Sequence, residues 1–305
     1  ALVALARLAP DDARRRIAGA RTSGNPWLRA YVARAAAVLN DTALLRQLAA
    51  DPDDNVKEIA IQGLSKLIGH AGDGAYLAAL DAAGVQAVRA AAIALKGSPR
   101  RDVPARALDA YQRIRRGGSE TARDARVALL EAAGRPASDD RPPLSDFALP
   151  ADAIALALGA DVRLHVTMAG GGSFVVRLRG DVAPIMAARV LALVRQGYYD
   201  GLTWHRVEPD FVIQGGGPGA NEYVGHRHFV RDELGTVPHV RGTVGMSTRG
   251  HDTGDAQWFV NLKDNLRLGR DYTVFAEVTE GMEVVDGILE GDIMARVREA
   301  GEPAP

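Results

Sequence analysis

The hydrophobic pattern of this chain changes at a proline-rich stretch, and the change limits the folds that are open to it. Before Gly134, apolar residues recur at helical spacing in segments that short Gly, Pro and Asp clusters separate. The stretch 134–150, GRPASDDRPPLSDFALP, holds four prolines, which is typical of an extended linker. Beyond it, residues 161–168 and 173–180 alternate apolar and polar side chains, as half-buried strands do. We therefore predict a helical domain at 1–134, a linker at 135–150 and a β-rich domain at 151–305.

The helical domain shows a loose internal repeat. Segments 25–39, 53–67, 85–97 and 119–134 each place an apolar residue directly before a basic one. These pairs are Leu28-Arg29, Val56-Lys57, Val88-Arg89 and Ala122-Arg123, spaced 28, 32 and 34 residues apart. The pattern resembles HEAT repeats, in which paired helices stack into a solenoid, and an unrelated helical bundle is the alternative. A solenoid offers a protein partner an extended surface, on which the four basic residues form one ridge or are simply solvated.

The second domain begins with two strands and a helix. Residues 181–196 follow the helical pattern, with an apolar stripe of Met186, Val190, Leu191 and Val194. Short strands bounded by glycine-rich turns come next, ending with a strand at 271–278 and an amphipathic segment at 280–291. Many short strands with two helices predict a closed antiparallel β-barrel with two capping helices.

The composition excludes several kinds of partner and site. With a formal net charge of -1 over 305 residues, the chain lacks the concentrated positive field that nucleic acids or anionic membranes require. Cysteine is absent, which excludes disulfides and thiolate nucleophiles. No run reaches the ~18–20 apolar residues of a membrane-spanning helix. The chain starts without methionine, so we expect that the native start precedes Ala1, and the sequence leaves the compartment open.

Neither a nucleotide nor a metal site is predicted. The glycines of residues 169–172 precede a strand, whereas a phosphate-binding loop precedes a helix. The pair His226 and His228 lacks a fixed spacing to a third ligand. We interpret these two residues, together with His239 and His251, as solvated loop histidines, and expect no cofactor.

Six motifs follow one another in the second domain. They are GYYDGLTWHRV, PDFVIQGGG, RGTVGM, AQWFVNLKDN, YTVFAEV and EGMEVVDGI. In this order they resemble the cyclophilin-type peptidyl-prolyl cis-trans isomerases, over residues 161–298. The resemblance implies an eight-stranded closed barrel with a substrate groove on its outer face. It also implies an enzyme that assists protein folding and acts on proline-containing peptides or unfolded client proteins.

The resemblance assigns residue roles as well. The catalytic arginine of the family falls on Arg206 and the glutamine that aligns it on Gln214. The family's substrate-binding positions fall on Phe211, Val212, Ser247, Thr248, Arg249, Gln257, Phe259, Leu268 and Tyr272. We interpret Trp204 and His205 as structural.

These residue types suit the chemistry. Rotation about an X-Pro bond must overcome the loss of amide resonance, a barrier of about 20 kcal/mol, and no bond is made or broken. An apolar pocket can hold the proline ring while a permanent donor such as Arg206 favours the twisted peptide over the planar one. Because no essential group titrates near neutrality, we expect activity to be nearly constant from about pH 6 to 9.

The sequence departs from the family at Ser247-Thr248-Arg249, where many relatives carry Ala-Asn-Ala. We expect these residues to lie in a strand beside the groove, and Arg249 to favour an acidic residue before the proline or further along the peptide. The alternative function is a non-catalytic protein that binds proline-containing segments. Retention of Arg206 favours the enzyme, because a binding protein has no need of the arginine.

Overall fold

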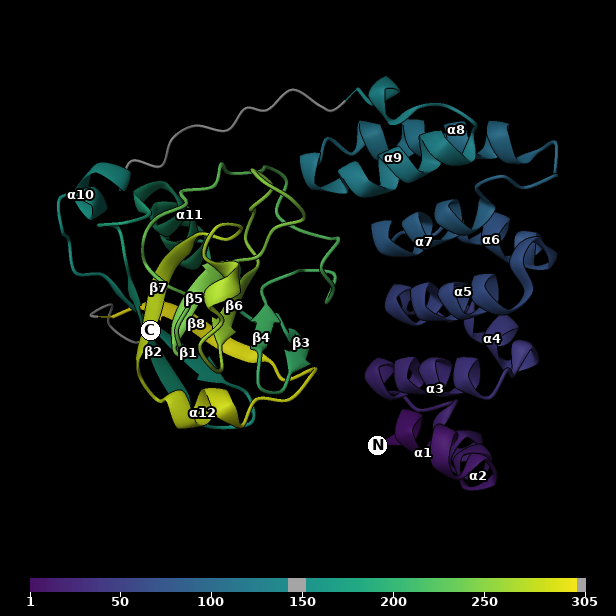
Figure 1. Ribbon diagram of the computed structural model, residues 1–305, viewed down its shortest axis with the longest axis horizontal. Coiled ribbons are helices and arrows are strands. Elements are labelled where there is room, and N and C mark those ends of the chain that lie inside the picture. Colours follow the sequence, from purple (N-terminus) through teal and green to yellow (C-terminus); the bar gives the residue numbers. More distant parts are fainter. Residues whose placement is uncertain (142–151, 301–305) are drawn as a thin grey trace. The chain divides into compact units, whose positions relative to one another are not determined.

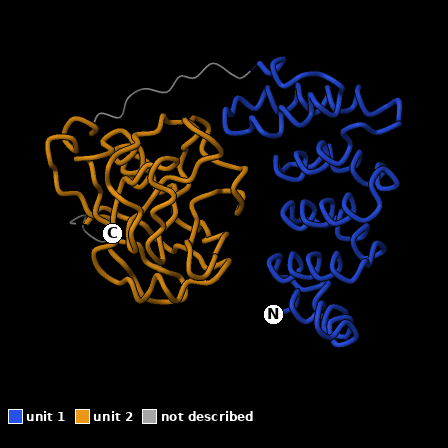
Figure 2. Tube along the Cα trace, in the orientation of Figure 1, with its two compact units in different colours: residues 1–144 blue, residues 145–305 orange. Residues whose placement is uncertain are grey.

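The computed structural model describes residues 1–141 and 152–300. The chain divides into two compact units, 1–144 and 145–305 (Figure 2), which we call the helical unit and the sheet unit. Each has its own hydrophobic core. The linker predicted at 135–150 lies for the most part outside the described residues. None of the helices in the described ranges has the length and apolar content that crossing a bilayer requires.

The helical unit is built from antiparallel α-helices joined by short turns. Its helices are α1 (Leu2–Leu8), α2 (Pro10–Ala20), α3 (Pro26–Val38), α4 (Thr42–Leu48), α5 (Asp54–Ile68), α6 (Asp73–Ala79), α7 (Val85–Leu95), α8 (Val103–Arg116) and α9 (Arg123–Ala132). The four predicted repeat segments coincide with α3, α5, α7 and α9, and these helices pack one on the next (Figure 1). Alanine at many buried positions lets neighbouring helices approach closely.

Side-chain caps define where these helices begin. The Asn25 side chain accepts a hydrogen bond from the Trp27 backbone N–H, and Pro26 follows at the first helical position. Asp53 accepts from the backbone N–H groups of Asn55 and Val56 at the start of α5. Such caps satisfy N–H groups that have no partner within the helix.

Arg29 does not belong to an exposed basic ridge, so this part of the prediction is wrong. Arg29 makes a two-pronged ion pair with Asp51, at 2.8 Å for each prong, and also donates to the Ser23 carbonyl. The side chains of Arg29 and Asp51 are only 12% and 6% exposed. Arg29 therefore stabilises the contact between successive helices and is not available to a partner.

Within residues 152–300, the sheet unit contains one eight-stranded antiparallel sheet and three α-helices (Figure 1). The strands are β1 (Arg163–Met168), β2 (Ser173–Leu178), β3 (Trp204–Glu208), β4 (Val212–Gly215), β5 (Thr243–Met246), β6 (Trp258–Asn261), β7 (Val274–Glu280) and β8 (Met294–Glu299). They pair in the order β3-β4-β6-β5-β7-β2-β1-β8. The helices are α10 (Ala153–Ala157), α11 (Pro184–Arg195) and α12 (Met282–Asp286), one more than predicted.

The sheet is a curled half-barrel, so the closed barrel predicted from the sequence is wrong. The edge strands β3 and β8 form no ladder, and a single bridge joins Thr203 to Ile293 just ahead of them. The two edges meet at their first residues, where Trp204 hydrogen-bonds through its backbone to Gly291 and Asp292, and Met294 to Gly201 and Leu202. This pairing does not continue along β3 and β8, so the sheet stays open there.

The core of the sheet unit follows strand alternation. In β1 every second side chain is buried, beginning at Leu164. The predicted apolar stripe of α11 is confirmed, with its four residues at most 1% exposed. However, α11 begins after Ala183, three residues later than the predicted helix, and Asp181 pairs with Arg179.

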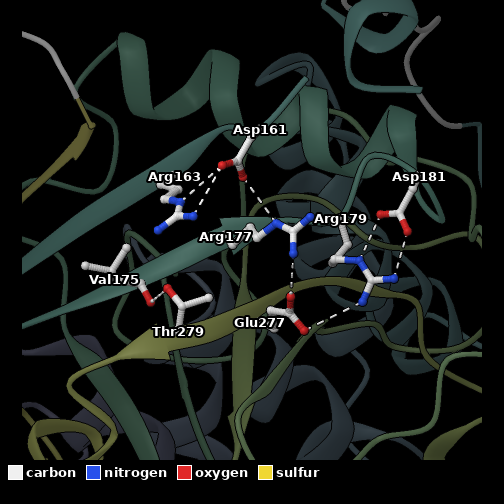
Figure 3. Close-up of polar contacts among 8 residues, drawn as sticks. All are labelled: Asp161, Arg163, Val175, Arg177, Arg179, Asp181, Glu277 and Thr279. Carbon is white, nitrogen blue, oxygen red and sulfur yellow. Dashed lines mark hydrogen bonds and ion pairs between the residues drawn. The ribbon is translucent and has the colours of Figure 1, made fainter. Parts of the chain in front are cut away.

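The opposite face of β1, β2 and β7 carries a network of exposed ion pairs (Figure 3). Glu277 on β7 pairs with Arg177 of β2 at 3.4 Å and with Arg179 at 3.6 Å. Asp161 pairs with Arg177 and Arg163, and Asp181 with Arg179. Opposite charges on neighbouring strands favour this pairing register.

Candidate active site

A small apolar cluster lies on the side of the sheet away from the main core. It comprises Val212, Phe259 and Leu268, with Phe211 and Tyr272 packed against them, and we call it the pocket cluster. Strand alternation explains it, because the neighbours Ile213, Trp258 and Val260 point into the main core. All five residues were predicted as substrate-binding, and the structure brings them together.

Phe259 forms the centre of the pocket cluster. Its ring stacks on the imidazole of His239, with centroids 5.7 Å apart and planes 18° apart. The Tyr272 ring meets Phe259 edge to face at a centroid distance of 5.6 Å. Two rings from distant segments thus fix the position of Phe259.

A row of polar side chains runs beside the pocket cluster. Arg206 on β3 is paired with Gln214 on β4. Gln214 is in turn paired with Phe259 on β6. The Arg206 Nη1 donates to the Gln214 Oε1 at 3.4 Å. The Gln214 Nε2 donates to the Ser247 Oγ at 2.8 Å and to the Gln257 Oε1 at 3.3 Å.

The row is buried at the glutamine end and open to solvent at Arg206. Gln214 is 3% and Gln257 2% exposed, and the Gln257 Nε2 also donates to the Val224 carbonyl at 3.0 Å. The Arg206 side chain is 42% exposed. A guanidinium that contacts one buried amide and is otherwise open to solvent can donate to a bound peptide.

Arg267 lies beside the candidate site, and the sequence analysis did not single it out. Its guanidinium lies over the Phe211 ring at 4.7 Å, and that of Arg206 lies 5.8 Å from the same ring. In the sequence, the one indication of this contact is that Arg267 directly precedes Leu268, a predicted substrate-binding residue. Phe211 is therefore flanked by two cations, each attracted to its ring.

Ser247, Thr248 and Arg249 follow β5 and do not lie in a strand, contrary to expectation. The Ser247 N–H donates to the Gln257 carbonyl at 2.8 Å, which places Ser247 within the polar row. Arg249 contacts the Glu222 carbonyl, and its guanidinium lies 5.9 Å from the Tyr223 ring. Thr248 is half-buried between them.

The histidines differ in their surroundings, and the expectation that all four loop histidines are solvated is wrong. His239 is fully buried. His226 is half-buried against Arg189, and burial lowers its pKa to about 4. On β3, His205, which we interpreted as structural, is buried, and burial lowers its pKa to about 4. In residues 1–141 and 152–300, no three histidine or acidic side chains come together in a metal-binding group.

Comparison with known proteins finds relatives of the sheet unit. Residues 163–302 match the model of the family described as cyclophilin type peptidyl-prolyl cis-trans isomerase/CLD. Peptidyl-prolyl cis-trans isomerase B of Bacillus subtilis (strain 168) is 36% identical over 133 residues, which is 43% of this chain and 93% of that protein. A peptidyl-prolyl cis-trans isomerase of Helicobacter pylori (strain ATCC 700392 / 26695) is 36% identical over 130 residues, 41% of this chain and 80% of that protein. A crystal structure of a Cryptosporidium parvum cyclophilin type peptidyl-prolyl cis-trans isomerase has a TM-score of 0.44 at 20% identity, covering 47% of this chain and 99% of that chain.

Proposed function

The chain belongs to the cyclophilin-type peptidyl-prolyl cis-trans isomerase family, and we propose that its sheet unit catalyses X-Pro isomerisation with Arg206 as the catalytic donor. The pocket cluster and the polar row supply the two parts that this reaction needs. One part holds the proline, and the other stabilises the twisted peptide bond.

The pocket cluster binds the pyrrolidine ring. Phe259 and Val212 form its floor, and Phe211, Leu268 and Tyr272 form its walls. Burial of apolar surface contributes about 25 cal/mol per Å², which suffices to hold a small apolar ring. Because this binding is equally strong in the planar and twisted states, it lowers KM and does not by itself raise kcat.

Arg206 supplies the selective part. As the X-Pro bond twists, the nitrogen lone pair leaves the amide resonance and becomes a hydrogen-bond acceptor. A guanidinium that donates to this nitrogen stabilises the twisted state only, and ~5–7 kcal/mol of such stabilisation accelerates rotation by roughly 10⁴–10⁵. Gln214 holds the guanidinium at 3.4 Å, and Ser247 and Gln257 hold Gln214.

The observation that carries this proposal is the register between the two parts. Gln214, which touches Arg206, is directly paired with Phe259, the floor of the pocket cluster. Paired residues of an antiparallel ladder have Cβ atoms ~4.5–5.5 Å apart on one face of the sheet. A proline on Phe259 therefore lies within reach of the Arg206 guanidinium.

We assign a protein-binding role to the helical unit. The helices at the predicted repeat positions, α3, α5, α7 and α9, pack one on the next, which supports a HEAT-like array. Such an array would deliver unfolded client proteins to the isomerase. In this arrangement the protein assists folding. Measuring the refolding of a proline-limited client with the full chain and with residues 150–305 alone tests the role. Equal acceleration by both would remove it.

The test of catalysis is an isomerisation assay with a proline peptide. Arg206→Ala in the full chain is expected to lower kcat/KM by about 10²–10³, the usual effect of removing one donor to a transition state. Arg296→Ala, which removes an exposed arginine of β8, is the matched control and retains full activity. The non-catalytic alternative predicts that the unaltered chain is inert and still binds the peptide through the pocket cluster.

A further inference from the structure

Four buried polar side chains lie directly behind the pocket cluster. His239 and Asn261 are 0% exposed, Asn265 is 4% and Thr243 is 6%. A buried polar group without a partner costs about 1–3 kcal/mol, so such a group persists only where its hydrogen bonds are made. The proposed mechanism uses none of these four residues.

Their hydrogen bonds form one connected network. The Asn261 Nδ2 donates to the Thr243 Oγ1 at 2.9 Å and lies 3.2 Å from the His239 Nδ1. The Asn261 Oδ1 accepts from the Asn265 Nδ2 at 2.8 Å. The His239 Nε2 lies 3.0 Å from the Tyr272 carbonyl oxygen.

These contacts define the tautomer of His239. A carbonyl oxygen can only accept, so the Nε2 atom must carry the proton. The Nδ1 atom is then the acceptor for the Asn261 amide, and both ring nitrogens are satisfied. A buried imidazole with both nitrogens engaged has a single orientation.

Each wall of the pocket cluster is attached to this network. His239 stacks on Phe259 and donates to the Tyr272 backbone. The Asn265 side chain donates to the Phe211 carbonyl at 2.9 Å, and the Asn265 backbone carbonyl accepts from the Leu268 N–H at 2.9 Å.

The two ends of the network are also joined through the backbone and the sheet. The Asn265 N–H donates to the His239 carbonyl at 2.6 Å. Val212 is paired with Asn261 across the β4–β6 ladder. Phe259, Tyr272 and Phe211 thus contact side chains of the network, while Leu268 and Val212 are joined to it through the backbone alone.

We propose that His239 is a positioning residue for isomerisation, which sets the spacing of Phe259 and Tyr272 through its stacked, Nε2-protonated imidazole. It acts through these two residues and does not touch the substrate. The inference rests on the proposed function of the pocket cluster. Because a displacement of about 1 Å at a reacting group can cost about 10²-fold in rate, loss of this support lowers catalysis.

Two variants of His239 separate the contribution of ring stacking from that of hydrogen bonding. His239→Phe retains a ring on Phe259 and removes both hydrogen bonds, and His239→Gln retains an amide donor for Tyr272 and removes the ring. We expect each to lower kcat/KM for a proline peptide by about 10-fold, measured where urea titration shows the variant to be folded. His165→Gln, at an exposed position of β1, is the matched control and changes nothing.

The outcome separates this inference from the proposed function. If folded His239 variants keep kcat/KM within twofold of the unaltered protein while Arg206→Ala loses activity, the positioning role is refuted and the catalytic assignment stands. If Arg206→Ala retains activity, the catalytic assignment itself is refuted.

Nuclear magnetic resonance of the unaltered full chain tests the positioning role without the need for a variant that folds. Correlation of imidazole nitrogens with ring protons is expected to show His239 as the Nε2-protonated tautomer at pH 7.5. Saturation with a proline peptide is expected to shift the His239 signals, because the peptide contacts the ring stacked on it, and to leave those of His165 in place. An Nδ1-protonated His239, or signals that the peptide does not move, would overturn the proposal.

Discussion

The Phe259 ring lies directly over the Cα atom of Gly245. A Cβ atom added at Gly245 would be 2.3 Å from the ring Cζ and under 3.0 Å from both Cε atoms. Gly245 is paired with Phe259 across the β5–β6 ladder, and its backbone is not in the left-handed region. Glycine is therefore required here for space and not for conformational freedom.

Gly245→Ala is expected to displace the Phe259 ring. The overpacking costs about 1–3 kcal/mol of stability, and kcat/KM for a proline peptide falls by about 10-fold because the pocket floor moves. The control is Gly235→Ala, at a position where nothing lies within 4 Å of the new Cβ. Full activity in a folded Gly245→Ala protein would show that the ring position is not critical.

The activity of the unaltered protein is expected to be nearly independent of pH from about 6 to 9. Arginine keeps its proton over this range, and no other proposed catalytic group gains or loses one. The measurement is kcat/KM for one peptide at five or more pH values. A bell-shaped profile would contradict the assignment of Arg206 as the donor.

Because of His205, the free energy of unfolding is expected to decrease as the pH falls. Burial lowers its folded-state pKa from 6.5 to about 4, so below pH 6.5 the unfolded chain binds the proton more tightly than the folded one. The free energy of unfolding therefore decreases as the pH falls from 6.5 towards 4, by about 2 kcal/mol at pH 5.

The matched comparison for this prediction is His205→Leu. Between pH 7.5 and 5, the variant should lose about 2 kcal/mol less stability than the unaltered protein in urea titrations. Taking the difference cancels groups such as Asp255, a carboxyl whose pKa burial raises. Identical pH dependence in the two proteins would mean that His205 does not titrate abnormally.

Arg29→Met is expected to destabilise the helical unit by about 3 kcal/mol. It leaves the Asp51 carboxylate buried without its cation, and breaking a buried pair costs about 3–5 kcal/mol. The control is Arg14→Met, which removes the ion pair between Arg14 and Asp11. The distance in this pair is similar, at 2.9 Å, but its two side chains are 58% and 87% exposed. This control should cost under about 0.5 kcal/mol. Circular dichroism of the helical transition measures both, and equal losses would contradict the argument.

Glu277→Gln removes the central acid of the exposed network in Figure 3. Because its partner Arg177 is 45% exposed, solvent screens the pair, and we expect a loss below about 1 kcal/mol. The loss should vanish in about 1 M NaCl, where the Debye length is about 3 Å. A loss above about 2 kcal/mol that salt leaves unchanged would show that the network is effectively buried.

Much of the candidate site could be predicted from the sequence. The ordered motifs identify Arg206, Gln214 and Phe259, and strand periodicity explains why these side chains leave the core. Periodicity and capping are local properties, which is why the positions of α3, α5, α7 and α11 follow from short segments. The sequence did not reveal whether the sheet closes, because closure depends on which edge strands meet.

The sequence by itself determined the family of the sheet unit and the residues that we propose to carry the chemistry. Only the tertiary structure decided how those residues are supported. His239, which the sequence suggests to be a solvated loop residue, meets Tyr272, 33 positions away, and Arg29 is buried against Asp51, 22 positions away. Burial and pairing of this kind depend on segments that are distant in the chain, and no local pattern encodes where those segments meet.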